Sequence, residues 1–318
     1  MPITSTEFNF HQLTTVNSEL AYLKFILKLS QSRHKHKPFK QLKLLFRSIY
    51  WLQPSKTWFE TIANSTILTK LLLKQPGLIE KIHKPYLRLD YSIHRRLAAI
   101  SEHYLLLNQC FNQVSLKKIM FDSGICLATI ATEQSQFQLV LAAVGDDCKE
   151  GELEIRLIDA NHSSLSILRF NFFKATAGLG LYIAAIQGPK GLDSKALVKT
   201  ACLQLSGLSP NRLVIEACLA MAKQLNVQQI VMVNDHQQVF KHKQNLHFNY
   251  NQFATDLGAR LTQNDDWELP LFIERKAKAD TPRKRRAKYQ RQHAFLNNCY
   301  ENCSKKLFSQ LKTMNFLN

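Results

Sequence analysis

Acidic and imidazole side chains suited to general acid–base catalysis stand at two places in this chain. His103 falls on the apolar side of an expected helix, where an imidazole could exchange a proton near neutral pH. Glu150 and Glu152 alternate along an expected strand with Glu154, so the three carboxylates share one face. His103, Glu150 and Glu152 are therefore the catalytic candidates. The simpler interpretations are a hydrogen-bonded packing histidine and a solvated acidic row.

A glycine-containing turn at residues 187–193 connects an expected strand to an expected helix. Free backbone N–H groups, the helix N-terminus and the ammonium group of Lys190 could together hold a pyrophosphate. The turn resembles the Gln-x-x-Gly-x-Gly/Ala loop of GNAT-type acyltransferases, except that Lys190 occupies the position of the first glycine. The resemblance implies CoA or acyl-CoA as cofactor, bound by Gln187, Gly188, Lys190 and Gly191. A plain Gly/Pro turn is the alternative.

Basic residues are concentrated toward the two ends of the chain. Lys and Arg number 42 against 24 Asp and Glu, which gives a net charge of +18. Residues 24–96 carry 16 basic and 3 acidic side chains, residues 275–291 carry 9 and 1, and residues 97–274 carry 14 and 17. A field of this size implies an anionic partner, which could be acidic lipid, a phosphorylated envelope precursor or nucleic acid.

The basic run at residues 283–291 is the strongest electrostatic feature, because guanidinium groups grip phosphates bidentately. A solvated basic helix is the alternative interpretation. No zinc finger, RNP motif or helix-turn-helix pattern is visible, so nucleic-acid binding would lack a base-reading element. The predicted anion-binding residues are Arg95, Arg96, Tyr250, Lys284, Arg285, Arg286, Tyr289 and Arg291.

The seven cysteines are scattered without a Cys-x-x-Cys pair, which is typical of buried thiols in a reducing compartment. Cys299 and Cys303 with His293, and the pair His34 and His36, are incomplete ligand sets, so no metal site is predicted. The N-terminus lacks the apolar stretch of a secretory signal, and no window approaches the ~20 apolar residues of a membrane span. We expect a cytoplasmic protein that can be peripheral to the inner membrane.

The spacing of apolar residues predicts an α+β fold. Intervals of three and four through residues 15–113 predict a basic, helical N-terminal region at residues 1–113. Within residues 114–187 the period changes to two, and short polar turns separate five expected strands of an antiparallel meander. We expect a helical layer, then a core at residues 114–318 with a mainly antiparallel sheet, helices packed on it and a basic C-terminal helix. The five expected strands are at 124–132, 137–144, 153–158, 164–172 and 179–186. The later expected elements are helices at 195–205 and 211–225, strands at 228–233 and 267–272, and a basic helix or helix pair from about 282 to 317.

Four separated stretches share an order and a spacing that identify a family. They are Arg95-Arg96-Leu97 with His103-Tyr104, Glu150-Gly151-Glu152-Leu153, Leu179-Gly180 through Gln187-Gly188 with Thr200 and Gly207-Leu208-Ser209-Pro210, and Tyr250 with Leu257-Gly258 and Lys284 through Tyr289. Together they resemble the bacterial VirK/YbjX family over about residues 85–300. The resemblance implies links to virulence, resistance to cationic antimicrobial peptides and envelope stress, but no particular reaction. Ser209 and Asn249 stand where the family commonly has Arg and an acidic residue.

Three functions are compatible with these patterns. The first is a cytoplasmic accessory protein of bacterial virulence, envelope stress and antimicrobial-peptide resistance that engages anionic lipid or envelope precursors through basic surfaces. The second is an acyl-CoA-dependent, GNAT-like transferase. The third is a nucleic-acid-binding regulator of expression. Convergence of Arg95, His103, Gln187, Tyr250 and Arg285 on one concave site would favour a small anionic ligand, whereas scatter would favour scaffolding.

Overall fold

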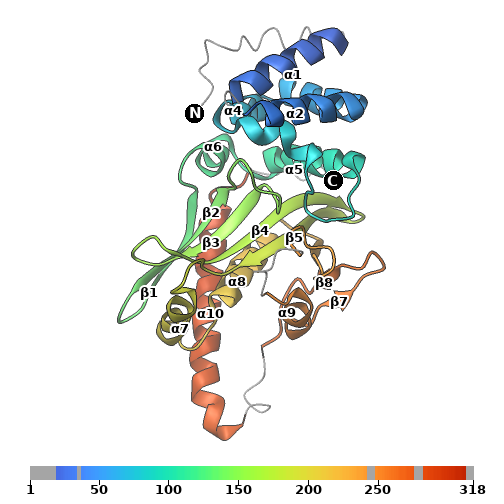
Figure 1. Ribbon diagram of the computed structural model, residues 1–318. Helices are drawn as coiled ribbons and strands as arrows, with labels where there is room; N and C mark the ends of the chain where they lie inside the picture. The colour runs from blue at the N-terminus through green and yellow to red at the C-terminus, as the bar shows by residue number, and fades with distance from the viewer. Residues whose placement is uncertain (1–18, 34–36, 242–247, 276–281, 313–318) are drawn as a thin grey trace. The chain divides into compact units, whose positions relative to one another are not determined.

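The computed structural model confirms the α+β class. It describes residues 19–33, 37–241, 248–275 and 282–312. These residues form a helical N-terminal stretch, an eight-stranded, mainly antiparallel sheet and a long C-terminal helix (Figure 1). The chain divides into two compact units. One is Met1–Tyr104 with Gly145–Lys149, called the helical unit below, and the other is Leu105–Val144 with Glu150–Asn318, called the sheet unit.

The helical unit packs short helices around aromatic and aliphatic side chains. Proline is the first residue of two of these helices, at Pro38 and Pro76, where its missing N–H leaves no hydrogen bond unmade. The indole N–H of the fully buried Trp58 donates to the Leu78 carbonyl at 3.1 Å, which satisfies its polar end. The elements are α1 (Glu19–Arg33), α2 (Pro38–Tyr50), α3 (Leu52–Ala63), α4 (Thr66–Lys74), the 3₁₀ helix η2 (Pro76–His83) and α5 (Ile93–Cys110), of which the residues from Leu105 onward belong to the sheet unit.

The sheet unit begins with the predicted antiparallel meander. Its strand order is β1-β2-β3-β4-β5-β6-β8-β7, and the β5–β6 pair is the parallel one among the strands that the structure describes. The strands are β1 (Ile125–Ala131), β2 (Gln136–Ala143), β3 (Leu153–Ile158), β4 (Ser164–Ala175), β5 (Gly178–Gln187), β6 (Gln229–Met232), β7 (Arg260–Leu261) and β8 (Trp267–Leu269). The helices are α6 (Gln113–Phe121), α7 (Ser194–Gln204), α8 (Pro210–Gln224), α9 (Tyr250–Asp256), η3 (Arg283–Arg285) and α10 (Arg286–Phe308).

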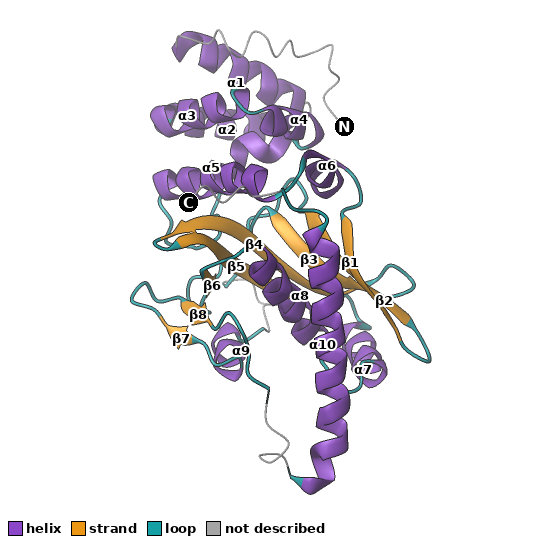
Figure 2. Cartoon of the chain, turned by 180° about the vertical axis from the view of Figure 1, so that it is seen from behind, coloured by secondary structure: helices purple, strands orange, loops and turns teal. Residues whose placement is uncertain are grey.

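Helices α8 and α10 cover one face of the sheet (Figure 2). Helix α8 is buried almost throughout and packs on β3, β4 and β5, while α10 packs on α8 and β1. The Ser209 side chain accepts a hydrogen bond from the Arg212 amide and Pro210 follows it, which is a strong helix start. Asn249 likewise caps α9 by accepting from the Gln252 amide. Both departures from the family pattern therefore serve as N-caps in this chain.

Alternation along β4 separates an apolar face from a polar one. The Ser166 hydroxyl donates to Asn211 of α8 at 2.7 Å, so the residues in phase with Ser166, including Phe170, face α8. Arg169 lies on the opposite face. Residues directly opposite on antiparallel strands share a face, and Arg169 pairs with Glu154 of β3. The polar candidates of the sequence thus gather on the face away from α8.

Strand β5 outlasts its parallel neighbour. The β5–β6 pairing runs from Gly180↔Gln229 to Ile183↔Met232, and the Val233 amide then bonds to the Ile183 carbonyl at 2.9 Å. An irregularity in the β4–β5 register follows, because Ile183 pairs with Phe170 but Ala185 pairs with Arg169. Bulges of this kind bend a strand and re-aim its side chains. Beyond it β5 continues to Gln187 without β6 beside it.

In the part of the chain that the structure describes, no helix is both long enough and apolar enough to cross a bilayer.

Candidate functional site

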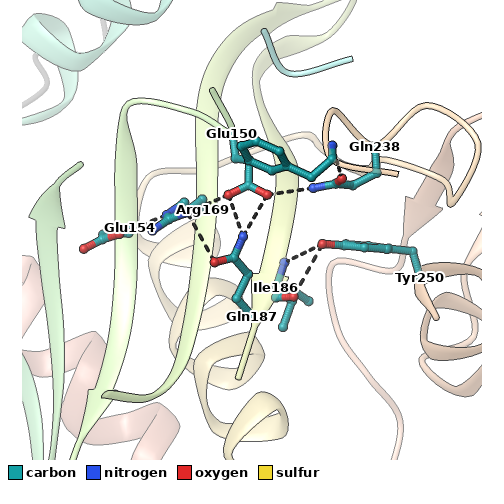
Figure 3. Close-up of polar contacts among 8 residues, drawn as sticks. Glu150, Glu154, Arg169, Ile186, Gln187, Gln238 and Tyr250 are labelled. Carbon is teal, nitrogen blue, oxygen red and sulfur yellow. Dashed lines mark hydrogen bonds and ion pairs between the residues drawn. The ribbon is translucent and has the colours of Figure 1, made fainter. Parts of the chain in front are cut away.

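A buried carboxylate lies at the centre of the polar face. Glu150 is fully buried just before β3 and accepts hydrogen bonds from three side chains (Figure 3). Arg169 Nη1 donates to its Oε2 at 2.5 Å, and Gln238 Nε2 donates to its Oε1 at 2.7 Å. Gln187 Nε2 lies 2.8 and 2.7 Å from the two oxygens. These four contacts use the acceptor capacity of a carboxylate, so the hydrogen-bonding needs of both Glu150 oxygens are met.

Arg169 links this carboxylate to a second one. Its Nε donates to Glu154 Oε2 at 3.1 Å, while its Nη1 also lies 3.4 Å from Gln187 Oε1. Arg156 Nε lies 3.3 Å from the other oxygen of Glu154. Two carboxylates are thereby matched by two guanidinium groups, which offsets much of the cost of burying charge. We call Glu150, Glu154, Arg169, Gln187 and Gln238 the carboxylate cluster.

The interpretation of the glutamates as a solvated row is wrong. Glu150, Glu152 and Glu154 are 0%, 1% and 9% exposed. Glutamate side chains are usually exposed unless they are paired. The partner that pairs with Glu150 and Glu154 is Arg169, which lies on another strand. Gly151 permits the turn between the first two, because its φ is +133° and a Cβ there would lie 2.8 Å from the Phe170 carbonyl oxygen.

Tyr250 lies beside the cluster and completes the free edge of β5. The Ile186 amide donates to its hydroxyl at 3.2 Å, and the hydroxyl lies 3.4 Å from the Ile186 carbonyl oxygen (Figure 3). Burial, with the negative charge of Glu150 nearby, raises the pKa of Tyr250 well above its usual range. Tyr250 is thus a neutral hydrogen-bonding group, and its predicted role in anion binding stays a prediction.

The segment after β6 is fixed to the start of α9 by reciprocal hydrogen bonds. Asp235 accepts from the Tyr250 and Asn251 amides at 2.8 and 3.1 Å. Asn251 Oδ1 accepts in turn from the Asp235 amide at 3.2 Å and from the Trp267 indole at 2.9 Å. Gln238 belongs to this segment, and its Oε1 accepts from the Phe240 amide at 2.5 Å. The segment therefore holds both Gln238 and Tyr250 toward β5.

The turn after Gln187 is open to solvent. Gly188, Lys190 and Gly191 are exposed, and a Cβ added at either glycine would meet no atom within 4 Å. The side chain of Asp193 makes no capping hydrogen bond at the start of α7. Lys190 forms no ion pair with a described residue. The Ser194 amide donates to the Gly191 carbonyl at 3.3 Å, so the next first-turn amides of α7, those of Lys195 and Ala196, and one ammonium group are the donors that could meet an anion beside the carboxylate cluster.

His103 belongs to the helical unit and is fully buried. Burial, helped by the charge of Lys81, lowers its pKa to about 3, and its ring packs edge-on against Tyr104 with centroids 5.2 Å apart. It does not exchange protons near neutral pH in this environment. The packing interpretation of this histidine fits its surroundings, while the catalytic roles predicted for His103, Glu150 and Glu152 stay predictions.

The predicted anion-binding arginines of the helical unit have different environments. Arg95 is exposed and lies over the Tyr91 ring at 4.9 Å. Arg96 is half-buried, and its Nη1 lies 3.4 Å from the Ile82 carbonyl. Burial and the nearby charge of Arg47 lower the pKa of Arg96, so two guanidinium groups are neighbours there.

The basic run of the C-terminal segment forms η3 and the first turns of α10, which extend beyond the sheet (Figures 1 and 2). Arg286 and Tyr289 are half-buried, whereas the other predicted anion-binding residues of this run are exposed. Lys284, Arg285 and Arg291 form no hydrogen bond or ion pair with the described residues of the carboxylate cluster. Of the five residues whose convergence would favour a small anionic ligand, Gln187 and Tyr250 come together beside Glu150, while Arg95 and His103 belong to the helical unit.

Sequence reasoning missed two members of the carboxylate cluster. Arg169 had a signal, because it is the one charged residue within the mainly apolar run from Leu165 to Phe173. Gln238 had none. It lies in an irregular segment and meets Glu150 from 88 positions further along the chain.

Cysteine and metal chemistry find little support in the described residues. All seven cysteines are free, and Cys110, Cys218, Cys299 and Cys303 are buried. A hydrogen bond with Cys299 and burial raise the pKa of Cys303. Across the described ranges, no group of three His, Cys, Asp or Glu side chains could hold a metal ion. The pair His34 and His36 lies outside the described residues.

Comparison with known proteins gives consistent matches over most of the chain. A family model described as a protein of unknown function (DUF535) matches residues 33–305. The uncharacterized protein YbjX of Escherichia coli K12 is 27% identical over 311 residues, which cover 93% of this chain and 94% of that protein. An uncharacterized protein of Haemophilus influenzae is 26% identical over 209 residues, 65% of this chain and 69% of its own length. A second one from that organism is 24% identical over 220 residues, with 68% and 72% covered.

The carboxylate cluster predicts the effect of an isosteric change. Glu150→Gln should lower the free energy of unfolding by about 3 kcal/mol, because an amide donor would then face donors from Arg169, Gln187 or Gln238. Urea unfolding followed by circular dichroism measures it. Glu301→Gln, on an exposed position of α10, should change stability little. Equal effects of the two substitutions would contradict the cluster.

The buried histidines predict a loss of stability in acid. Burial also lowers the pKa of His83, to about 4. Since unfolded histidine titrates near ~6.5, both contribute stability that is present above that pH and lost as pH falls toward their folded-state values. The free energy of unfolding should fall by about 2 kcal/mol per histidine between about pH 6.5 and pH 5. His83→Gln and His103→Gln should flatten this slope, whereas exposed His94→Gln should not.

Proposed function

The chain belongs to the VirK/YbjX family, whose model is described as a protein of unknown function (DUF535), and we propose that its sheet unit is a transferase that binds the acyl thioester of coenzyme A. The acyl chain would pass from the thioester sulfur to an acceptor nucleophile. The proposed cofactor site is the edge of β5 at its carboxyl end, together with the turn at residues 187–193.

The separation of β5 from β6 is the observation that carries the proposal. Ligands of open sheets bind outside the carboxyl ends of parallel strands, and in this sheet unit β5 runs on past the last residue of β6. The backbone of Ile186 is satisfied by the Tyr250 hydroxyl and not by β6. The pantetheine arm of CoA is extended and carries amides, so it could pair with this strand edge by β-strand addition once it displaces the Tyr250 hydroxyl from Ile186.

The turn after β5 suits the pyrophosphate of the same cofactor. It links a strand to a helix, as the resemblance to the GNAT-type loop requires, and both of its glycines have open space on the side of a Cβ. Lys190 supplies a cation and α7 supplies N–H groups that no side chain caps. A phosphate and an extended arm could thus bind along one continuous path.

The carboxylate cluster would position this site. Glu150 is fully hydrogen-bonded, so in this state it does not take a proton from an acceptor. It holds Gln187, the last residue of β5, and Gln238, the residue that keeps the segment after β6 in place. The cluster therefore fixes the segment after β6 beside the end of β5.

The cofactor proposal predicts ligand-dependent stability. CoA or an acyl-CoA at ~100 times its dissociation constant should stabilise the protein by ~2.7 kcal/mol, seen as a rise in thermal midpoint. Lys190→Glu should weaken binding by ~10- to 100-fold in calorimetry, because it replaces a phosphate-binding ammonium by a carboxylate. Lys199→Glu makes the same charge change at an exposed position further along α7 and should bind normally. No thermal shift across a panel of CoA esters would refute the proposal.

A second candidate function is favoured by the exposure of the basic turns at the start of α10. The role is that of a cytoplasmic accessory protein in virulence, envelope stress and antimicrobial-peptide resistance that engages anionic lipid at the membrane surface. Basic residues at a helix N-terminus oppose the helix dipole, and no acidic residue stands in the first turn of α10. The arrangement costs stability within the fold, which an anionic lipid surface would offset.

Charge reversal at the two ends of α10 tests this second function. Arg283→Glu with Arg285→Glu should reduce co-sedimentation with phosphatidylglycerol vesicles by ~10-fold or more, since each basic residue contributes ~1 kcal/mol at an anionic surface. Glutamate near the N-terminus of α10 interacts favourably with the helix dipole, so this helix should still form. Lys305→Glu with Lys306→Glu, exposed near the other end, is the matched control. Equal binding of wild type to anionic and neutral vesicles would exclude the function, and tight, steeply salt-dependent binding to duplex DNA would instead favour the nucleic-acid regulator.

A further inference from the structure

Helix α2 carries a row of large apolar side chains on its exposed side. The row consists of Phe39, Leu42, Phe46, Ile49 and Tyr50. At about 100° per residue these five positions occupy roughly a third of the helix circumference. Their side chains do not share the face by which α2 packs, because Leu44 and Ser48 are the buried residues of this helix. The exposed fractions are 81% for Phe39, 65% for Leu42, 66% for Phe46, 51% for Ile49 and 71% for Tyr50.

A row of this kind differs from scattered surface leucines. Single exposed apolar residues are normal, but contiguous apolar patches bordered by polar residues mark sites of interaction. Phe46 and Tyr50 stack on one another with centroids 6.3 Å apart, so the row presents a continuous aromatic surface at its C-terminal half. The helix thus buries one side, at Leu44 and Ser48, and leaves a second, apolar side exposed.

The border of the row is basic. Lys40, Lys43 and Arg47 lie side by side along one edge of it on the helical projection, between the apolar row and the buried side. None of the three forms an ion pair with a described residue. Residues 20–59 contain nine basic side chains and no acidic one.

Charge decides which occupant fits this surface. A second copy of the chain would place the same cationic surface against itself, which is unfavourable. An anionic bilayer instead offers phosphate groups to the basic edge and acyl chains to the apolar row. An amphipathic helix with aromatic residues on one side and Lys and Arg on the other is the arrangement that lies in a membrane interface.

We propose that α2 is an interfacial membrane-binding helix, with Phe39, Leu42 and Phe46 inserted among acyl chains and Lys40 and Lys43 at the headgroup phosphates. The proposal deepens the second candidate function, on which it rests, because it assigns lipid contact to an element other than α10. It is independent of the acyl-CoA proposal. The neighbouring guanidinium groups of Arg47 and Arg96 add to the positive potential beside the helix.

The test compares two double substitutions in the full-length chain. Leu42→Glu with Phe46→Glu removes apolar contacts from α2, and Leu105→Glu with Leu203→Glu makes the same change of charge at exposed leucines of the sheet unit. Partition into phosphatidylcholine vesicles with and without phosphatidylglycerol is measured by co-sedimentation. We expect the α2 variant to lose ~10-fold or more of its partition into anionic vesicles, and the control to keep most of it. All four positions are exposed, so both variants should fold, which circular dichroism checks.

Each other outcome overturns the proposal in a distinguishable way. Wild-type binding to anionic vesicles with equal binding of both variants would reject α2 while leaving the second candidate function in place. Equal losses in both variants would show that net charge alone matters. Failure of the wild type to bind any vesicle would reject the second function together with the helix. Wild-type dimers that the α2 substitutions convert to monomers in analytical ultracentrifugation would assign the row to a second copy.

Discussion

One buried carboxylate, Glu150, holds together the part of the sheet where β5 and β6 separate. A charge with no exposed surface is tolerated only when its hydrogen bonds are met, and Arg169, Gln187 and Gln238 meet them from β4, from β5 and from the segment after β6. Strands β4 and β5 are consecutive, but the segment after β6 is remote from them in sequence. Their arrangement around a single carboxylate is therefore fixed by the cost of leaving it unpaired.

The neighbouring features follow from this constraint. The irregularity between β4 and β5 lies at Arg169, the residue that bridges Glu150 and Glu154. Gln187 is both the end of β5 and a ligand of the carboxylate, so the open turn that follows starts from a fixed point. Tyr250 satisfies the strand edge that β6 leaves. The proposed cofactor site and the proposed lipid-binding helix thus belong to different units. The first depends on a buried charge, and the second on an exposed apolar surface.

The sequence was informative where structure follows local periodicity. The strand predicted at residues 153–158 has those bounds as β3, because its alternation of apolar and polar residues matches the pleat. The strand expected at residues 267–272 is present as the shorter β8, whereas the two-residue strand β7 escaped that signal. The place of β8 beside β6 depends on tertiary pairing, in which Met232 meets Trp267, and β7 pairs in turn with β8. The carboxylate cluster was partly visible through Glu150 and Gln187, but their burial and the role of Gln238 arise from long-range contacts that no periodicity encodes.

A double-mutant cycle between Glu150 and Gln238 tests the central constraint most directly. Unfolding free energies would be measured for Glu150→Ala, Gln238→Ala and the double variant. The structure predicts a coupling of about 1–3 kcal/mol, because the two side chains share a buried hydrogen bond of 2.7 Å. Additivity within about 0.5 kcal/mol would contradict the account, since independent residues could not tie the segment after β6 to β5.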